Sequence, residues 1–280
     1  MNYRTSFVLI VAGLVAGPEF SMAAPSIELD GKIVQGAVVM GRTAPGTKLT
    51  LGDTKIRVSS SGNFIIGFGR DAPKQVELRA VFPDGGAQLR MLEVGQRKYK
   101  VQRIDGLPKR KVSPSKKDMK RIGAEGAKIN SARARDTDKS FFRNGFVWPV
   151  KGRISGVYGS QRILNGKPRR PHLGVDIAAP TGTPIVATAD GIVRIAHSGM
   201  FFTGKTVAID HGHGLLSIYA HMSEVSVKNG QRVSKGAPIG KVGATGRVTG
   251  PHLHWGVSWF KTRLDPALLV GPMKPKKPKS

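Results

Sequence analysis

Residues 250–259 read Gly-Pro-His-Leu-His-Trp-Gly-Val-Ser-Trp, a stretch in which large apolar residues alternate with small or polar ones. Successive side chains of an extended strand point to opposite faces, so the odd-numbered residues from Leu253 to Trp259 would cover a core. The other face would carry His252 and His254 with their Cα atoms about 7 Å apart. Glycine and serine beside them leave space above the backbone. We therefore expect one strand that packs on a core and offers two imidazoles to a metal or acid/base site.

The composition favours an all-β, turn-rich chain with two modest domains. The 280 residues include 36 glycines and 18 prolines, and only 6% are aromatic. Short runs of valine, isoleucine and leucine between turn residues are typical of such folds. Because the chain has no cysteine, disulfides and thiolate zinc sites are excluded, and histidine and carboxylate would have to hold any metal.

The net charge of +27 points to an anionic polymer as partner. Nucleic acid is the usual polymer of this kind, but the N-terminus indicates export. Residues 1–24 combine Arg4, an apolar run at 7–16 and the small residues Ser21 and Ala23, which is the pattern of a cleavable secretory signal. A membrane anchor is the alternative, although the run is shorter than the ~20 residues of a span. We expect a periplasmic or cell-envelope protein that has no stable membrane anchor after cleavage.

Residues 25–96 predict a small β-sandwich that serves as an accessory domain, since short apolar runs alternate there with turn residues. The domain contains no histidine and shows no chemistry of its own. The candidate strands are Lys32 to Met40, Lys48 to Leu51, Lys55 to Val58, Phe64 to Phe68, Gln75 to Phe82 and Gln88 to Val94.

Residues 97–144 predict a basic linker with one helix. The segment from 97 to 135 holds 14 basic and three acidic residues, a charge run that could simply be a solvated face. Ser115 and Asp118 have the spacing of a capping box, so a helix is expected to start there and to pack on one of the domains. Its packing face would consist of Met119, Ile122, Ile129 and Ala132.

Residues 145–270 predict a second β domain, which contains all seven histidines. Residues 271–280 hold four lysines and three prolines and predict a disordered basic tail. Within the second domain, His172 and Asp176 stand four apart in a segment that Pro171 and Gly174 favour as extended or looped. This pair of ligand types suits zinc.

The segment Leu215 to His221 predicts another strand. Its alternation gives Leu216, Ile218 and Ala220 a core face and puts Ser217, Tyr219 and His221 on the opposite one. We therefore expect His221 to be aimed like His252 and His254, with Tyr219 beside it.

The remaining histidines are interpreted as structural. His211 and His213 form a second His-x-His pair, but the glycines around them are typical of a hairpin turn. His197 is expected to be structural or to lie at the rim.

A catalytic zinc takes three protein ligands and keeps one position open for water. His172, Asp176 and one histidine of the 252/254 pair complete this set. The other histidine of that pair and His221 then stay uncoordinated, as hydrolysis by a zinc-activated water requires. The spacing alone does not decide which strand histidine is the ligand.

The combined pattern resembles the lysostaphin- and LytM-type zinc metallopeptidases, which are secreted or periplasmic peptidoglycan endopeptidases with a duplicated hybrid motif fold. The resemblance covers roughly Pro149 to Leu269 and no ligand position is substituted, unlike in inactive scaffold or activator members. It rests on the segments His172-x-x-x-Asp176, Tyr219-Ala220-His221-Met222, Gly250-Pro251-His252-Leu253-His254, Asp190-Gly191-Ile192-Val193 and Lys228-Asn229-Gly230-Gln231-Arg232-Val233.

The resemblance implies that His172, Asp176 and His254 bind one Zn²⁺ and that His221 and His252 are the catalytic pair. It also implies a compact antiparallel β domain with the site in a groove across its sheet. The activity implied is zinc-dependent hydrolysis of peptide crosslinks in peptidoglycan. D-alanyl–diaminopimelate links are the first choice of bond and glycine bridges the second.

The substrate implied is rich in carboxylates, and residues 145–270 have 15 basic against five acidic residues. Arg162, Arg169 and Arg170 are close in sequence to His172 and are candidates for binding those carboxylates; Tyr219 is a further candidate for substrate contact. The alternatives are a non-catalytic wall-binding module, an activator of another wall hydrolase, and a basic nucleic-acid binder. The accessory domain and linker could also cover the groove and keep an enzyme latent.

Overall fold

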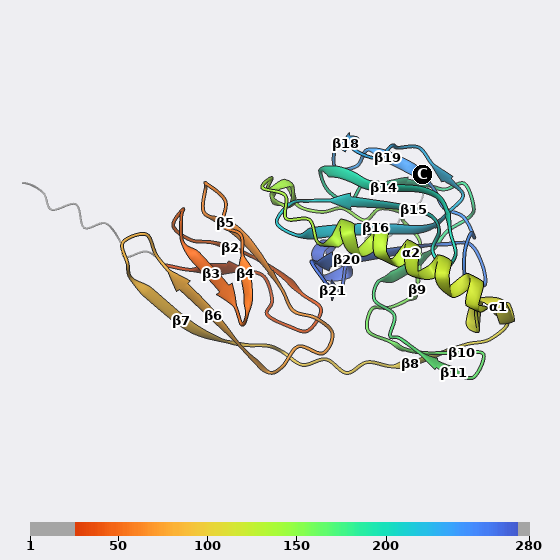
Figure 1. Ribbon diagram of the computed structural model, residues 1–280, viewed down its shortest axis with the longest axis horizontal. Helices are drawn as coiled ribbons and strands as arrows, with labels where there is room; N and C mark the ends of the chain where they lie inside the picture. Colours follow the sequence, from red (N-terminus) through yellow and green to blue (C-terminus); the bar gives the residue numbers. More distant parts are fainter. Residues whose placement is uncertain (1–25, 274–280) are drawn as a thin grey trace, which may run out of the picture.

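The structure is a computed structural model that describes residues 26–273 (Figure 1). The expected signal segment and most of the expected basic tail lie outside these residues. Among the residues described, no helix is both long and apolar enough to cross a bilayer. The all-β class is confirmed, since most elements of the described residues are strands and the few helices connect, cover or follow them.

The N-terminal block consists of two antiparallel sheets that share one core, as the sandwich prediction requires. Val39, Phe64 and Leu78 are fully buried in that core. The first sheet has the order β1 (Glu28–Asp30), β2 (Val38–Arg42), β5 (Asn63–Gly67); the second has the order β4 (Thr54–Ile56), β3 (Lys48–Leu51), β6 (Gln75–Val81), β7 (Ala87–Glu93).

The first expected strand, Lys32 to Met40, is wrong in its extent. A tight turn at Gln35 and Gly36 interrupts it, and β2 begins only at Val38. Gly36 has a φ of 90°, a conformation that costs glycine little and other residues much.

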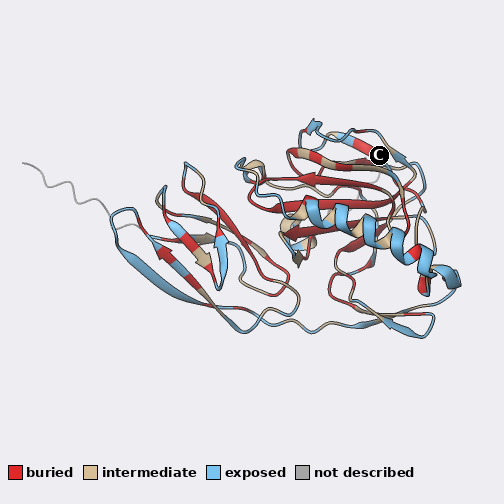
Figure 2. Ribbon diagram, in the orientation of Figure 1, coloured by how far each residue is buried: buried red, intermediate tan, exposed pale blue. Residues whose placement is uncertain are grey.

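The expected linker helix is α2 (Lys116–Arg133), and it begins at the predicted capping box. The Asp118 N–H donates to Oγ of Ser115 at 3.1 Å, which satisfies one of the free donors of the first turn. Ala132 and Ile129 pack on the outer face of the large sheet, whereas Met119 is 53% exposed and is wrong as a packing residue. Figure 1 shows α2 lying across β14, β15 and β16, and Figure 2 shows its exposed outer side.

The segment around α2 contains more structure than a linker. It contributes the strand β8 (Val101–Ile104) as well as the short helices α1 (Lys109–Val112) and η1 (Phe141–Asn144). β8 was not expected from the sequence. It pairs in parallel with β10 (Gln161–Leu164), which pairs with β11 (Lys167–Arg169), so a strand from the linker belongs to a sheet of the second block.

The second block is organised around one large antiparallel sheet. Its order is β18 (Arg232–Val233), β14 (Gly191–Met200), β15 (Gly204–Asp210), β16 (Leu215–Met222), β20 (His252–Trp259), β12 (Val175–Ala178) and β9 (Arg153–Gly156), with β21 (Thr262–Leu264) also paired to β20. A small sheet of β13 (Pro184–Val186), β19 (Pro238–Lys241) and β17 (Glu224–Val225) flanks it, and α3 (Ala267–Val270) follows β21.

The stretch at residues 250–259 forms β20, near the middle of the large sheet. Leu253 and Trp255 have no exposed surface and Val257 is 2% exposed, so the predicted core face is confirmed. Because β20 pairs with β16 on one side and β12 on the other, residues far apart in sequence meet at His254. Its Cα partners are Ala220 and Asp176.

Candidate metal and catalytic site

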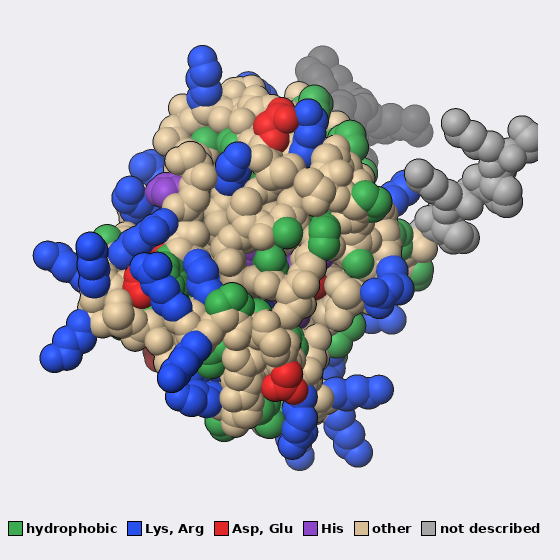
Figure 3. All heavy atoms as spheres, turned by 90° about the vertical axis from the view of Figure 1, so that its right-hand side faces the viewer, with side chains coloured by type: hydrophobic (Ala, Val, Ile, Leu, Met, Phe, Trp, Pro, Cys, Tyr) green, Lys and Arg blue, Asp and Glu red, His purple; other side chains and the backbone are tan. Residues whose placement is uncertain are grey.

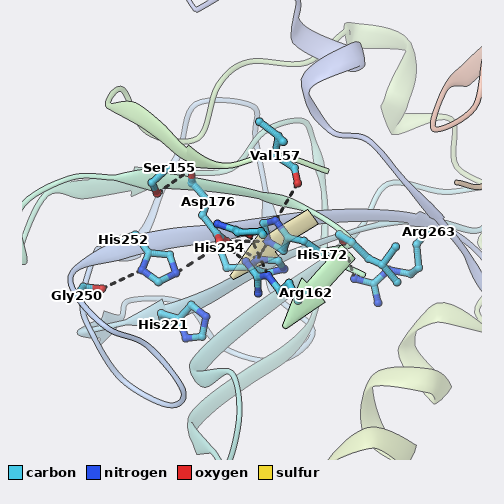
Figure 4. Close-up of polar contacts among 12 residues, drawn as sticks. Ser155, Val157, Arg162, His172, Asp176, His221, Gly250, His252, His254 and Arg263 are labelled. Carbon is cyan, nitrogen blue, oxygen red and sulfur yellow. Dashed lines mark hydrogen bonds and ion pairs between the residues drawn. The ribbon is translucent and has the colours of Figure 1, made fainter. Parts of the chain in front are cut away.

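Three predicted ligands meet above the large sheet, and they come from two strands and one loop (Figure 4). Asp176 of β12 and His254 of β20 are Cα partners in neighbouring strands, and His172 lies in the loop before β12. Oδ1 of Asp176 is 2.8 Å from Nδ1 of His254 and 2.9 Å from Nε2 of His172. The two imidazole nitrogens are 3.0 Å apart, so three potential ligand atoms face one point.

This arrangement fits a zinc ion. Tetrahedral ligands with bonds of 2.0–2.1 Å lie roughly 3.3 Å from one another, and the three observed distances are only slightly shorter. Nδ1 of His172 lies 3.1 Å from the carbonyl oxygen of Val157. Since a carbonyl only accepts, Nδ1 carries the proton and the lone pair of Nε2 points to the other ligand atoms.

The protonation states of these residues also favour a cation. Burial acts to raise the pKa of Asp176, but hydrogen bonds with His172 and His254 outweigh it and hold that pKa well below 3.8. Burial lowers the pKa of the His254 imidazole to about 4. Near neutral pH Asp176 is therefore a carboxylate and His254 a neutral imidazole, which are the forms that bind zinc.

His252 and His221 lie beside this cluster but outside it. Their ring centroids are 4.8 Å apart, and Nε2 of His252 is 3.9 Å from Oδ1 of Asp176. Nδ1 of His252 donates to the carbonyl of Gly250 at 2.9 Å, and Nδ1 of His221 donates to the carbonyl of Thr245 at 2.8 Å. In the neutral form of either ring, Nε2 is therefore the unprotonated nitrogen. Burial, reinforced by His252 and His254, lowers the pKa of His221 to about 3.

The expectation that His221 is aimed like the β20 histidines is confirmed, since its ring lies 4.8 Å from that of His252 and 6.1 Å from that of His254 between centroids, but the expectation that Tyr219 shares its face is wrong. Tyr219 pairs with Trp255 on the core side of the sheet, whereas Ala220 pairs with His254 on the site side. By simple alternation His221 would point into the core. It reaches the site because its φ is 66° and because two residues of β16, Ala220 and His221, oppose one residue of β15. Such a β-bulge re-aims a side chain.

Tyr219 is also wrong as a substrate contact. Its side chain has no exposed surface, and its hydroxyl accepts from the Thr188 N–H at 2.8 Å. The same hydroxyl accepts from Ser217 at 3.0 Å, and Ser217 lies 2.7 Å from Nε2 of His211. Tyr219 therefore belongs to a buried polar network that supports the sheet.

The predicted turn around the other histidine pair is confirmed. His211 and His213 lie between β15 and β16, both buried, and His213 has a φ of 50°. Nδ1 of His211 donates to the carbonyl of Asp190 at 2.6 Å. His197 is half-buried in β14, and its Nδ1 accepts from the Gly199 N–H at 3.0 Å.

The three arginines predicted from their closeness to His172 have different partners. Nη2 of Arg162 lies 2.6 Å from Oδ2 of Asp176, so the guanidinium forms an ion pair with a predicted metal ligand. Arg169 donates to the backbone carbonyls of Pro168 and Val112. Arg170 lines a cavity next to His172 together with Arg247. Sequence reasoning missed Arg247, although it stands only five residues before His252.

The sheet of β8, β10 and β11 forms a roof over the site. One face of this roof carries Gln102 and Ile104 from the linker strand. Beneath them is a cavity of about 170 Å³ that Asp176, His221 and His252 also line. A larger cavity of about 660 Å³ lies on the side of His172 and His254.

Known proteins resemble this chain most clearly around the site. The sequence profile of peptidase family M23 matches residues 170–266. The peptidoglycan DD-endopeptidase ShyA of Vibrio cholerae is 43% identical over 111 residues, which are 39% of this chain and 26% of that protein. The cell division protein DipM of Caulobacter vibrioides is 34% identical over 152 residues, which are 53% of this chain and 24% of that protein. This chain thus spans about a quarter of the length of the curated relatives it matches.

One solved structure agrees over most of the chain. It is a crystal structure from Pseudomonas aeruginosa assigned to peptidase M23. The two structures superpose with a TM-score of 0.65 at 31% identity, over 86% of this chain and 96% of the other.

Proposed function

This chain belongs to peptidase family M23, and we propose that it is a zinc-dependent endopeptidase that hydrolyses peptide crosslinks of bacterial peptidoglycan. The observation that carries the proposal is that a group of metal-ligand side chains lies next to a second group of uncoordinated imidazoles. Two histidines and one aspartate bring three ligand atoms within 3.0 Å of one another. Two further imidazoles stand beside them with Nε2 free.

In this proposal His172, Asp176 and His254 hold the zinc ion. When bound there, zinc acts as a Lewis acid that lowers the pKa of a coordinated water to about 7 and polarises a carbonyl. The fit of the donor set and its spacing supports this assignment.

His252 and His221 are proposed to carry the proton. Backbone carbonyls hold both Nδ1–H groups, so Nε2 of either ring can take a proton from the attacking water. The imidazolium formed can then give that proton to the amine of the broken peptide bond. The pKa of about 3 keeps His221 unprotonated at the start of the cycle near neutral pH.

The proposed substrate is the D-alanyl–diaminopimelate link, and the proposed location is the periplasm or cell envelope. Support comes from ShyA, a relative named as a peptidoglycan DD-endopeptidase. The surface charge also supports an anionic substrate, because lysine and arginine side chains far outnumber acidic ones on the face shown in Figure 3. A cationic surface attracts an anionic polymer.

We also propose that the roof must open for turnover. The cavity at Asp176, His221 and His252 measures about 170 Å³, which is smaller than the ~300 Å³ at the low end of ligand pockets. Its roof includes Gln102, Ile104 and Leu107. With β8 in place, a crosslinked peptide has too little room at the two imidazoles, so the linker would limit access.

The test is the digestion of purified sacculi by the purified protein, followed by mass spectrometry of the released muropeptides. We expect new D-alanine carboxyl and diaminopimelate amino ends in the presence of zinc and none after chelation. Restoring zinc should restore the ends. A protein that binds sacculi but releases no new ends with zinc present would instead be a wall-binding module or an activator.

A further inference from the structure

We propose that Arg247 anchors a carboxylate-binding subsite beside the metal ligands. The carboxylate would be the one on the carbon that bears the released amine, carried on the aliphatic arm of diaminopimelate. This inference rests on the proposed function and narrows it, since a glycine bridge has no such carboxylate.

The subsite is the cavity of about 660 Å³ against His172 and His254. Its lining is cationic, with five arginines and no acidic residue among the residues that line it. These arginines are Arg162, Arg169, Arg170, Arg247 and Arg263. A hollow of this charge beside a peptidase site is suited to an anionic group of the substrate.

Three of these arginines already make contacts within the protein. Arg162 is paired with Asp176 at 2.6 Å, and Arg263 donates to the carbonyl of Leu173 at 3.2 Å. Arg169 likewise donates to two backbone carbonyls. Arg170 is exposed, and among the half-buried arginines that the structure describes, Arg247 makes only one long hydrogen bond, at 3.5 Å.

Arg247 is held in place without an acidic partner. Its guanidinium lies over the ring of Phe202, with Cζ 4.3 Å from the centroid. Within residues 26–273 its side chain makes one hydrogen bond, to the carbonyl of Lys111 at the long distance of 3.5 Å. Burial lowers its pKa to about 10, and Arg162 and Arg169 add to that effect. A cation that is buried among cations is stabilised by an anion.

Arg247 also lies where a substrate carboxylate would be needed. It lines the large cavity and equally the small one, which contains Asp176, His221 and His252. A carboxylate bound to Arg247 would therefore be next to the place where the bond is cleaved. This position fits a group attached to the same carbon as the released amine.

The rest of the large cavity fits the aliphatic arm. Apolar side chains from the linker and α2 form one wall, and Leu164 and Phe202 continue it. The linker and α2 residues are Val112, Pro114, Met119 and Ile122. A methylene chain that ends in further polar groups would contact this wall while its carboxylate faces Arg247.

The test compares two soluble crosslinked peptides, one with the free carboxylate at this carbon and one with a carboxamide in its place. We expect the wild type to cleave the carboxylate peptide with a kcat/KM about ten- to a hundredfold higher, since a charge-assisted pair is lost in the amide. Arg247→Met should lower kcat/KM for the carboxylate peptide to the level of the amide peptide. It should change cleavage of the amide peptide little.

Arg232→Met is the matched control. The Arg232 guanidinium also lies over a phenylalanine ring, with Cζ 5.2 Å from the centroid of Phe141, but it lines neither cavity. This variant should keep the preference for the carboxylate peptide.

Equal cleavage of the two peptides by the wild type would overturn the subsite, and this comparison needs no variant to fold. A preference that survives in Arg247→Met would overturn the role of Arg247. If the wild type cleaves neither peptide, the proposed function fails instead. Calorimetric binding of the two peptides to the wild type then still decides the subsite, because equal affinities would contradict it.

Discussion

Nη2 of Arg162 lies 2.6 Å from Oδ2 of Asp176, while Oδ1 of the same carboxylate faces the imidazoles of His172 and His254. Arg162 thus orients the Asp176 carboxylate from the side opposite the imidazoles and offsets part of its negative charge. It comes from β10, in the roof, whereas Asp176 comes from β12, in the large sheet. The roof and the proposed metal site are therefore coupled through this one ion pair.

Arg162→Gln should weaken zinc binding. Loss of a partner that orients a metal ligand typically costs about 10–100-fold in metal affinity. Competition with a chromophoric chelator measures the affinity. Arg169→Gln is the control, because Arg169 is the cross-strand partner of Arg162 and its hydrogen bonds go to backbone carbonyls. Equal affinities for wild type and Arg162→Gln would show that the ion pair does not support the site.

His221→Asn should keep the fold and the zinc but lose turnover. Asparagine tolerates a positive φ better than most residues, so the backbone at 66° is retained while the imidazole is removed. The loss expected for a missing proton carrier is about 10²–10⁴-fold in kcat. The rate of muropeptide release, together with zinc content and the melting temperature, checks this. Full activity of the variant would remove His221 from the mechanism.

The stability of the fold should fall as the pH drops below 6.5. Burial lowers the pKa of His211 from 6.5, so its ring stays neutral in the folded protein where an unfolded histidine takes up a proton. The unfolded state then binds more protons, and unfolding becomes easier by up to about 1.4 kcal/mol per pH unit for such a group. Stability should be retained above pH 6.5.

Urea denaturation at a series of pH values measures this slope. His211→Gln should be less stable throughout, because contacts to Asp190 and Ser217 change, but its stability should depend less on pH. The same pH slope in variant and wild type would contradict a neutral buried His211.

A disulfide across the roof should block turnover reversibly. Arg103 of β8 and Ile163 of β10 are Cα partners, and the chain has no cysteine of its own. The double variant Arg103→Cys, Ile163→Cys would fix the linker strand in place when oxidised. If β8 has to separate from β10 to admit the substrate, the oxidised form is inactive on sacculi and reduction restores activity. Equal rates for the oxidised and reduced forms would show that β8 is a permanent wall.

Much of the fold could be predicted because its signals are local. β3 has the predicted bounds, α2 begins at the predicted capping box, and β20 shows the predicted two faces. β8 could not be predicted in this way. Its four residues pair in parallel with β10, about sixty positions later in the sequence. Because parallel strands are not joined by a tight turn, no turn or alternation near β8 marks the pairing.

The site was predictable as a set of residues but not as a geometry. The spacing of His172, Asp176 and the 252/254 pair indicated the ligand types, the family resemblance selected His254, and the structure brings these three together. The bulge that turns His221 toward the site depends on how β16 pairs with β15. The alternation of residues within β16 gives no sign of that pairing. The partner of Arg162 likewise depends on a contact between separate sheets.

The central claim is that His254 binds zinc whereas His252 carries the proton. Measuring zinc content together with turnover tests this claim most directly. Nδ1 of His254 is 2.8 Å from Oδ1 of Asp176, whereas Nε2 of His252 is 3.9 Å from the same atom. We predict that His254→Ala loses its zinc, and that His252→Ala keeps one zinc per chain but no longer releases muropeptides. Equal loss of zinc in the two variants, or full activity of His252→Ala, would contradict the account.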